Sequence, residues 1–204
     1  MKQIKLFLFA LALTVMPQAI SAQVPANAQS GVVEDLDAKY ATNLLKPGTD
    51  APDINLQTID GKQFSLKSLR GKYVVLDFWA SWCPDCRKDS PYIMSLYEKF
   101  APKGVEFVGV SFDTKAEAWK NGVKKLGIKY TQVSDMKHMR ESAVAQTYCV
   151  KWIPTVYVVD PEGKVVLGTV MSDKVGAAFM MAGIRLAQSR LRLSSSCAIS
   201  SGVL

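Results

Sequence analysis

The sequence predicts an α/β fold in which a central mixed β-sheet carries helices on both faces. Short apolar runs typical of strands alternate with longer helical stretches from residue 73 to residue 148. The run from Val74 to Phe78 is almost continuously apolar, as in a strand buried on both faces. Farther along, the turn Asp160-Pro161-Glu162-Gly163 joins two more strand-like runs into an antiparallel hairpin. Crossover connections followed by a hairpin predict a sheet with both parallel and antiparallel pairs.

The predicted elements follow one another closely along the chain. Residues 64–69 indicate a strand end and a turn of helix before a strand at 73–78. A helix is expected over 84–100, with Pro84 in its first turn and a kink at Pro91. The remaining predictions are a strand at 105–110, a helix at 115–126 ended by Gly127, a strand at 130–134, a short helix at 141–148, hairpin strands at 155–159 and 164–170, and a last helix at 173–193.

The first residues have the pattern of a secretory signal peptide. Lys2 and Lys5 precede an apolar run over residues 6–15, and the small residues Ser21 and Ala22 suit cleavage before Gln23. The alternative is an uncleaved anchor, but the apolar run is shorter than the ~20 residues of a membrane span. We therefore expect cleavage near Ala22, export to the periplasm and no stable membrane insertion afterwards. The expected organisation is an arm or linker over 23–45, one domain over 46–193 and a flexible tail over 194–204.

The basic charge of the chain does not indicate a nucleic-acid partner. The net charge is +7, and removal of Lys2 and Lys5 with the signal peptide lowers it by two. The remaining Lys and Arg residues are dispersed and form no dense block. Solvated basic faces are therefore the preferred interpretation.

Two cysteines two residues apart follow the apolar strand and begin a helix. Cys83 would lie at the positive end of the helix dipole, where a thiolate is stabilised relative to a thiol. Cys86 would lie one turn inside the helix and be less exposed. A strand, a Cys-x-x-Cys and a helix in this order are typical of a thiol-disulfide redox site. We expect Cys83 to attack a disulfide and Cys86 to resolve the intermediate.

A purely structural role for this pair is unfavourable. Joining Cys83 to Cys86 would restrict the unfolded chain by only about 2 kcal/mol, whereas joining Cys149 to Cys197 would give about 4 kcal/mol. A short loop is instead suited to a bond that must open and re-form. The intervening Pro84 and Asp85 leave the reduction potential open, because Asp85 opposes thiolate formation.

Asp77 is an acidic residue on a strand that is expected to be buried. Burial would raise its pKa and make it a proton acceptor for Cys86. An exposed or locally paired carboxylate is the alternative. Asp89, within the expected helix, is a second acidic candidate, with a solvated helix residue as its alternative.

Several further motifs share one family resemblance. These motifs are Lys46-Pro-Gly-Thr-Asp-Ala-Pro-Asp53, Asp60-Gly61-Lys62, Leu69-Arg-Gly-Lys72, Phe78-Trp79-Ala80-Ser81-Trp82-Cys83, Phe107-Val-Gly-Val-Ser-Phe-Asp113 and Ile153-Pro154-Thr155. From Lys46 to about Arg190 the chain resembles the redoxin (AhpC/TSA) branch of the thioredoxin superfamily, within it most nearly the TlpA/ResA-like bacterial extracytoplasmic thiol-disulfide oxidoreductases. The resemblance implies a thioredoxin-like fold. Thioredoxins carry Asp at the position of Asp77, whereas many TlpA/ResA-like proteins have Asn, and Asp89 matches an acidic position common in that group.

The resemblance also implies a substrate-binding region beside the cysteines. Pro154 would be a cis-proline lying against the Cys-x-x-Cys, and the backbone of Ile153 would be free to pair with a substrate strand. Trp82, Trp152 and Ile153 would then form an apolar rim for an extended polypeptide. Core packing is the alternative for Trp152.

Other residues give weaker signals. Cys149 is expected to be a buried or half-buried thiol, with surface modification or pairing with Cys197 as alternatives. The only histidine, His138, falls in a polar loop and is expected at the surface, so no metal site is predicted.

Three functions remain in competition at this point. The first is a periplasmic thiol-disulfide oxidoreductase that needs no bound cofactor, exchanges disulfides with protein substrates and receives electrons from an upstream redox protein, so that it acts as a reductant. The second is a peroxiredoxin-like peroxidase, disfavoured because Trp82 stands beside Cys83 and a Pro-x-x-x-Thr-x-x-Cys pocket is missing from the sequence. The third is a copper or other metal chaperone of the same fold.

Overall fold

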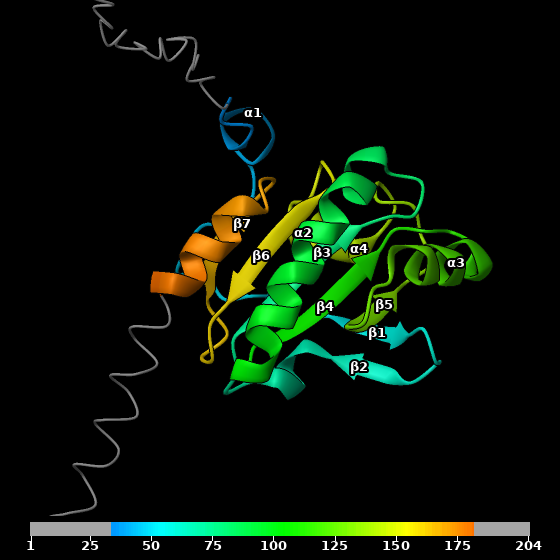
Figure 1. Cartoon of the computed structure of the whole chain (residues 1–204), viewed down its shortest axis with the longest axis horizontal. Coiled ribbons are helices and arrows are strands. Elements are labelled where there is room, and N and C mark those ends of the chain that lie inside the picture. Colours follow the sequence, from blue (N-terminus) through cyan, green and yellow to red (C-terminus); the bar gives the residue numbers. More distant parts are fainter. Residues whose placement is uncertain (1–33, 182–204) are drawn as a thin grey trace, which may run out of the picture. The chain divides into compact units, whose positions relative to one another are not determined.

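Strand β3 (Val74–Trp79) is an interior strand of a seven-stranded mixed sheet in the computed structural model, which describes residues 34–181 (Figure 1). The other elements are α1 (Asp37–Tyr40), β1 (Asn55–Thr58), β2 (Gln63–Ser65), the 3-10 helix η1 (Leu66–Leu69), α2 (Pro84–Phe100), the 3-10 helix η2 (Ala101–Lys103), β4 (Glu106–Ser111), α3 (Ala116–Leu126), β5 (Thr131–Ser134), α4 (Ala143–Thr147), β6 (Thr155–Val159) and β7 (Val165–Thr169). Residues 173–181 are also helical.

The order of the strands brings two separate segments of the chain together at one end of the neighbouring strands β3 and β6. The order is β2-β1-β5-β4-β3-β6-β7, with β3 parallel to β4 and antiparallel to β6. Phe78 pairs with Thr155 at the end of β3 that precedes the cysteines. The segment after β3 and the segment before β6 therefore meet, which places the cysteines next to Ile153 and Pro154.

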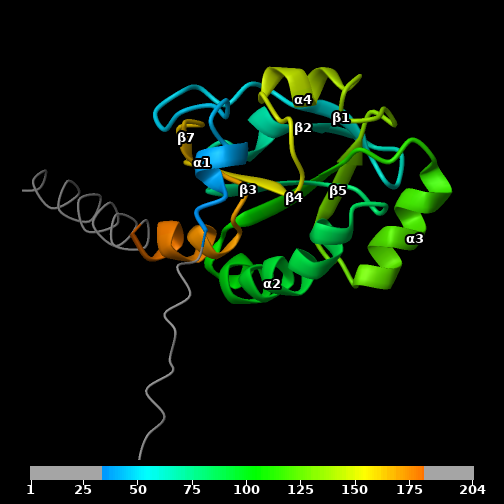
Figure 2. The same ribbon diagram turned by 90° about the horizontal axis from the view of Figure 1, so that it is seen from above.

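Each face of the sheet has its own core. On one face, Phe78 packs against the rings of Phe112, Tyr148 and Tyr157. On the other, Val75 belongs to a cluster that takes Ile93 from α2 and further side chains from the helix at 173–181. Figure 2 shows α2 and α3 on one side of the sheet and α4 on the other. Helices thus cover both faces, which confirms the fold class predicted from the sequence.

The structure contains one strand, β1, that the sequence did not predict. Strand β1 was not expected, because only Leu56 among its four residues is large and apolar; it pairs with both β2 and β5. Helix α2 continues through Pro91 to Phe100. The strands and helices for which bounds were predicted lie within two residues of them as far as residue 181, whereas no bounds were predicted for α1 and η2.

The segment after α1 contributes to the core. Ala41 and Leu44 are buried, and the backbone N–H of Leu45 donates to the Tyr157 hydroxyl at 3.0 Å. That hydroxyl in turn donates to the carbonyl of Tyr148. Part of the predicted arm over 23–45 is therefore packed against the sheet.

The proposed signal peptide, the start of the arm, the end of the last helix and the tail lie outside the described residues. Within residues 34–181, no helix is both long enough and apolar enough to cross a bilayer.

Candidate redox site

Cys83 and Cys86 are joined by a disulfide at the beginning of α2. Cys83 is the N-cap residue, with extended backbone, and Pro84 is in the first helical turn. The backbone N–H of Cys86 donates to Cys83 Sγ at 3.1 Å. After reduction, this N–H and the helix dipole would favour a thiolate on Cys83. Cys83 and Cys86 are each 4% exposed, so the expectation that Cys86 would be the less exposed of the two is wrong. Cys83 differs in bordering a groove that opens to solvent.

The loop before Cys83 is held by a buried carboxylate. Asp113 accepts hydrogen bonds from the Ser81 backbone N–H at 3.0 Å, from Ser81 Oγ at 2.6 Å and from Ser111 Oγ at 2.8 Å. From the other side, Arg87 donates to the Ser81 carbonyl at 3.0 Å. These contacts fix the path of the chain into the redox pair.

The residue before Pro154 lies directly against Cys83 Sγ. The Ile153–Pro154 peptide bond is cis, and Cys83 Sγ is 3.6 Å from the Ile153 carbonyl oxygen. The Thr155 hydroxyl donates to the Trp152 carbonyl at 2.7 Å, which holds the loop from the β6 side. The structure thus brings together the cysteines and the proline loop, 70 positions apart in the sequence.

Asp77 is buried at 6% exposure on β3 and bonded to a tyrosine. The hydroxyl of Tyr130 donates to Asp77 Oδ2 at 2.7 Å. Burial raises the pKa of Asp77 to about 7; the Tyr130 hydrogen bond opposes this rise, and the charge of Asp89 adds to it. Burial and the adjacent carboxylate also raise the pKa of Tyr130 well above its ordinary value. Asp77 is therefore poised to exchange a proton near neutral pH.

Asp77 and Cys86 border the same small cavity. Asp77, Cys86, Asp89, Ser90 and Pro154 all border a space of about 10 Å³, roughly the size that holds one water molecule. The Ser90 hydroxyl is buried and has no partner among the described residues. The Cys86 sulfur and the carboxyls of Asp77 and Asp89 therefore border the same small space.

Asp89 is a second partly buried acid on this cavity. It accepts a short hydrogen bond from the Ser172 hydroxyl. Burial raises the pKa of Asp89, the Ser172 bond lowers it, and the like charge of Asp173 raises it; the net shift is upward. Asp89 is thus not the freely solvated helix residue that the sequence left open.

Two tryptophans form exposed edges of the site. Trp82 is 46% exposed and stacks on His138, with ring centroids 5.4 Å apart and planes 9° apart. Trp152 is 39% exposed and stacks on Tyr40, with centroids 4.2 Å apart. Trp152 is therefore a surface residue at the site and not part of the core.

Trp152 and Asp85 separate two hollows on the surface. The first, of about 360 Å³, is termed the Cys83 groove and has basic side chains on one side; it is bordered by Cys83, Trp82, His138, Arg140, Lys151 and Ile153, among others. The second, of about 440 Å³, is termed the arm groove. Its walls come from the N-terminal arm, α2, the proline loop and residues 170–173.

Comparison with known proteins agrees with this geometry. A model of the AhpC/TSA family matches residues 47–167. The chain belongs to the AhpC/TSA family. It is 38% identical to the thiol-disulfide oxidoreductase ResA of Bacillus cereus over 122 residues. These aligned residues cover 60% of this chain and 68% of that protein.

Solved structures carry the same fold. The thioredoxin domain of a thiol-disulfide oxidoreductase from Bacteroides vulgatus matches with a TM-score of 0.57 and 36% identity, over 61% of this chain and 88% of that one. A thiol-disulfide oxidoreductase from Bacteroides fragilis matches with a TM-score of 0.61 and 26% identity, over 66% and 99%. This member of the AhpC/TSA family is thus a thiol-disulfide oxidoreductase with a thioredoxin-like fold, as its sequence led us to expect.

Three contacts of the site had no clear signal in the sequence. The fold brings three residues into contact with the site from segments at least 30 positions away from their partners: Tyr130, Asp113 and His138. Of the three, only Asp113 belongs to a motif that resembles the family, Phe107–Asp113, and that motif does not indicate its contact with Ser81.

Cys149 lies apart from the redox pair. It is a half-buried free thiol with a positive φ of 56°, and Cys197 lies outside the described residues. Among residues 34–181, no group of three or more His, Cys, Asp or Glu side chains is arranged to hold a metal ion.

Proposed function

We propose that this oxidoreductase is exported and reduces disulfides in proteins through its Cys-Pro-Asp-Cys pair. The observation that carries the proposal is the Cys83–Cys86 disulfide at the start of α2, with Cys83 Sγ beside the Ile153 carbonyl. A substrate strand could pair with the Ile153 backbone and present its own disulfide to Cys83. Export is supported by the signal-peptide pattern of residues 1–22.

The reaction uses two successive exchanges. In the reduced enzyme, the Cys83 thiolate attacks one sulfur of the substrate disulfide, which forms a mixed disulfide and releases the other substrate sulfur as a thiolate. Cys86 then attacks Cys83 Sγ, which restores the Cys83–Cys86 disulfide and releases the second substrate sulfur. Two electrons thereby pass from the enzyme to the substrate. An upstream dithiol protein must reduce the enzyme again, and no bound cofactor is needed.

Asp77 and Asp89 serve the second exchange in this proposal. Cys86 must lose its proton before it can attack, and both acids border the same small cavity as Cys86. Asp77, with its pKa near 7, is the main acceptor. Asp89 contributes through its charge and its position on the same cavity.

The substrate rim consists of Trp82, Trp152 and Ile153. The two tryptophans are exposed, and Ile153 lies next to Cys83 Sγ. Apolar and aromatic surface of this kind suits contact with an unfolded or extended segment of a protein.

A trapping experiment tests the assigned roles. Cys86→Ser should accumulate mixed disulfides with exported proteins, because Cys83 still attacks while the release step is lost. Cys83→Ser should trap none. The products are resolved by non-reducing electrophoresis with and without dithiothreitol, and Cys149→Ala serves as the control thiol variant.

Two outcomes would overturn the proposal. Equal trapping by both single variants would remove the distinction between attacking and resolving cysteines. Rapid reduction of hydrogen peroxide together with no trapping and no reduction of insulin would favour a peroxidase.

A further inference from the structure

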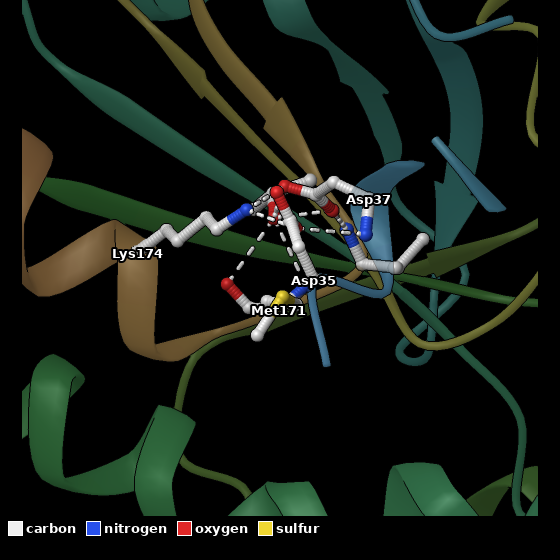
Figure 3. A network of polar contacts seen from close by, with 6 residues as sticks. Asp35, Asp37, Met171 and Lys174 are labelled. Carbon is white, nitrogen blue, oxygen red and sulfur yellow. Dashed lines mark hydrogen bonds and ion pairs between the residues drawn. The ribbon is translucent and has the colours of Figure 1, made fainter. Parts of the chain in front are cut away.

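Residues 35–40 are tied to the far end of the domain by a polar network, termed the clasp (Figure 3). The Asp37 carboxylate accepts hydrogen bonds from the Thr169 hydroxyl at 2.8 Å and the Val170 backbone N–H at 2.8 Å. Lys174 Nζ lies 2.6 Å from Asp37 and 2.7 Å from Asp35. Figure 3 shows Asp35, Asp37 and Lys174 pointing toward one another. The clasp therefore fixes the start of the arm.

Fixing the arm places two of its side chains beside the redox site. Leu36 and Tyr40 border the arm groove, and Tyr40 stacks on Trp152. Pro154 and Asp85 border the same groove, so it adjoins both the proline loop and the cysteine pair. One wall of the groove thus depends on the clasp.

Both halves of the clasp lie outside the part of the chain that matches the family. The match covers residues 47–167, whereas the clasp joins residues 35 and 37 to residues 169–174. The walls of the arm groove that come from the arm and from residues 170–173 therefore lie outside the matched region, whereas its other walls, next to the redox pair, lie inside it.

The charge of the arm groove is predominantly acidic. Asp85, Asp89 and Asp173 border it, and Lys88 is the single basic residue on its lining, paired with Asp85 at 3.2 Å. Asp173 acts on Asp89 as a like charge. Aromatic surface from Tyr40, Tyr92 and Trp152 forms much of the remaining wall.

We propose that the arm groove is a specificity site that receives a lysine or arginine side chain of the substrate, close to the substrate cysteine. This inference rests on the proposed function, since it requires a polypeptide disulfide at Cys83. The alkyl part of the side chain lies along the rings of Tyr40 and Trp152, and its cationic head reaches Asp173 and Asp89. The Cys83 groove, with Arg140 and Lys151, disfavours the same residue on the other side of Trp152.

Matched peptides test this site. Each peptide has one cysteine in a mixed disulfide with 5-thio-2-nitrobenzoate, whose release is followed by absorbance, and carries Lys or Glu two positions before or after the cysteine. In one of the two placements, the pre-reduced wild-type protein should show, in a single turnover that leaves Cys83–Cys86 as a disulfide, a second-order rate constant about fivefold higher for Lys than for Glu. Asp173→Asn should reduce this ratio to about twofold. Tyr40→Ala should also reduce it, and Tyr40→Phe, which keeps the ring, should restore it.

The control is Glu98→Gln, which removes one negative charge from an exposed ion pair with Lys129 away from the groove. It should leave the ratio unchanged. If it lowers the ratio as much as Asp173→Asn, the preference reflects net charge and the site is rejected. Equal rates for Lys and Glu in both placements would also reject the site while leaving the proposed function intact. Failure of the wild-type protein to release 5-thio-2-nitrobenzoate from any peptide would instead reject the proposed function.

Discussion

The buried Asp77 carboxyl makes the stability of the domain depend on pH. Its pKa is raised from 3.8 to about 7 in the folded state, so between these values the folded chain keeps a proton that the unfolded chain has lost. Stability contributed by this group is therefore highest below about pH 4 and declines as the pH rises to about 7. The full effect of such a shift is about 4 kcal/mol.

Asp77→Asn should remove this dependence. Unfolding by urea at several pH values should show that the variant gains about 4 kcal/mol relative to the wild type between pH 4 and pH 8. The buried amide adds a cost that is the same at both pH values and so does not affect the difference. Asp60→Asn, in an exposed turn, is the matched control and should show no such trend. A constant difference between Asp77→Asn and the wild type would mean that Asp77 is ionised throughout this range.

At the scale of single residues, the sequence was sufficient to identify site residues that lie close together along the chain. Cys83, Cys86 and Asp77 lie within ten positions, and their strand–helix context gives each a chemical setting. The contacts of Tyr130 with Asp77 and of Asp113 with Ser81 depend on the register of neighbouring strands. A single sequence does not contain that register, so these partners could not be predicted.

The four-residue helix α1 depends on contacts beyond its own residues. A helix this short is unstable alone, because nucleation costs more than its few hydrogen bonds return. The Asp37 carboxylate links it to the Thr169 hydroxyl and the Val170 N–H. The clasp therefore holds the helix in place together with the Tyr40–Trp152 stack and the burial of Ala41.

Asp37→Ala should release α1. Amide hydrogen exchange of Tyr40 and Ala41, which donate to the carbonyls of Leu36 and Asp37, should approach the rate of an unstructured peptide. Amides of β3 should remain protected. Asp35→Ala should have a smaller effect, because it removes an exposed ion pair with Lys174 and a hydrogen bond from the Asp37 backbone N–H but leaves the bonds of Asp37 to Thr169 and Val170 in place. Equal exchange in the two variants would show that the Thr169 and Val170 bonds do not hold the arm.

At the scale of elements, the predictions were correct where a strand is an almost continuous apolar run. The buried strands β3, β4 and β6 are almost entirely apolar and were located from composition alone. Strand β1 alternates exposed and half-buried residues at the border of the sheet, and its place is set by pairing with β2 and β5. Pairing partners of this kind were not visible in the sequence.

The two cores share one sheet, so the whole domain should unfold in one transition. Phe78 is fully buried and contacts three aromatic rings on its face of β3. Phe78→Ala should lower the free energy of unfolding by about 3–5 kcal/mol. Circular dichroism and tryptophan fluorescence in urea should give coincident curves. Met180→Ala, at an exposed position, should change stability by about 0.5 kcal/mol or less. Separate transitions for the two probes would mean that the two faces unfold independently.

For the molecule as a whole, the alternation of strands and helices and the closing hairpin were sufficient to predict the mixed sheet. The packing of Ala41 and Leu44 into the core was not predicted, because the segment around them is short and only weakly helical in pattern. Its contact with Tyr157 joins positions 112 residues apart.

The clasp also imposes an order on the maturation of the enzyme. Asp35 and Lys174 are separated by 139 positions, so during synthesis from the N-terminus the arm emerges long before its partner. The cysteines, β6 and Pro154 are all present before Lys174 is added. A nascent chain can therefore acquire its redox pair while the arm is still unattached, and it becomes selective among substrates only after nearly the whole domain has been made.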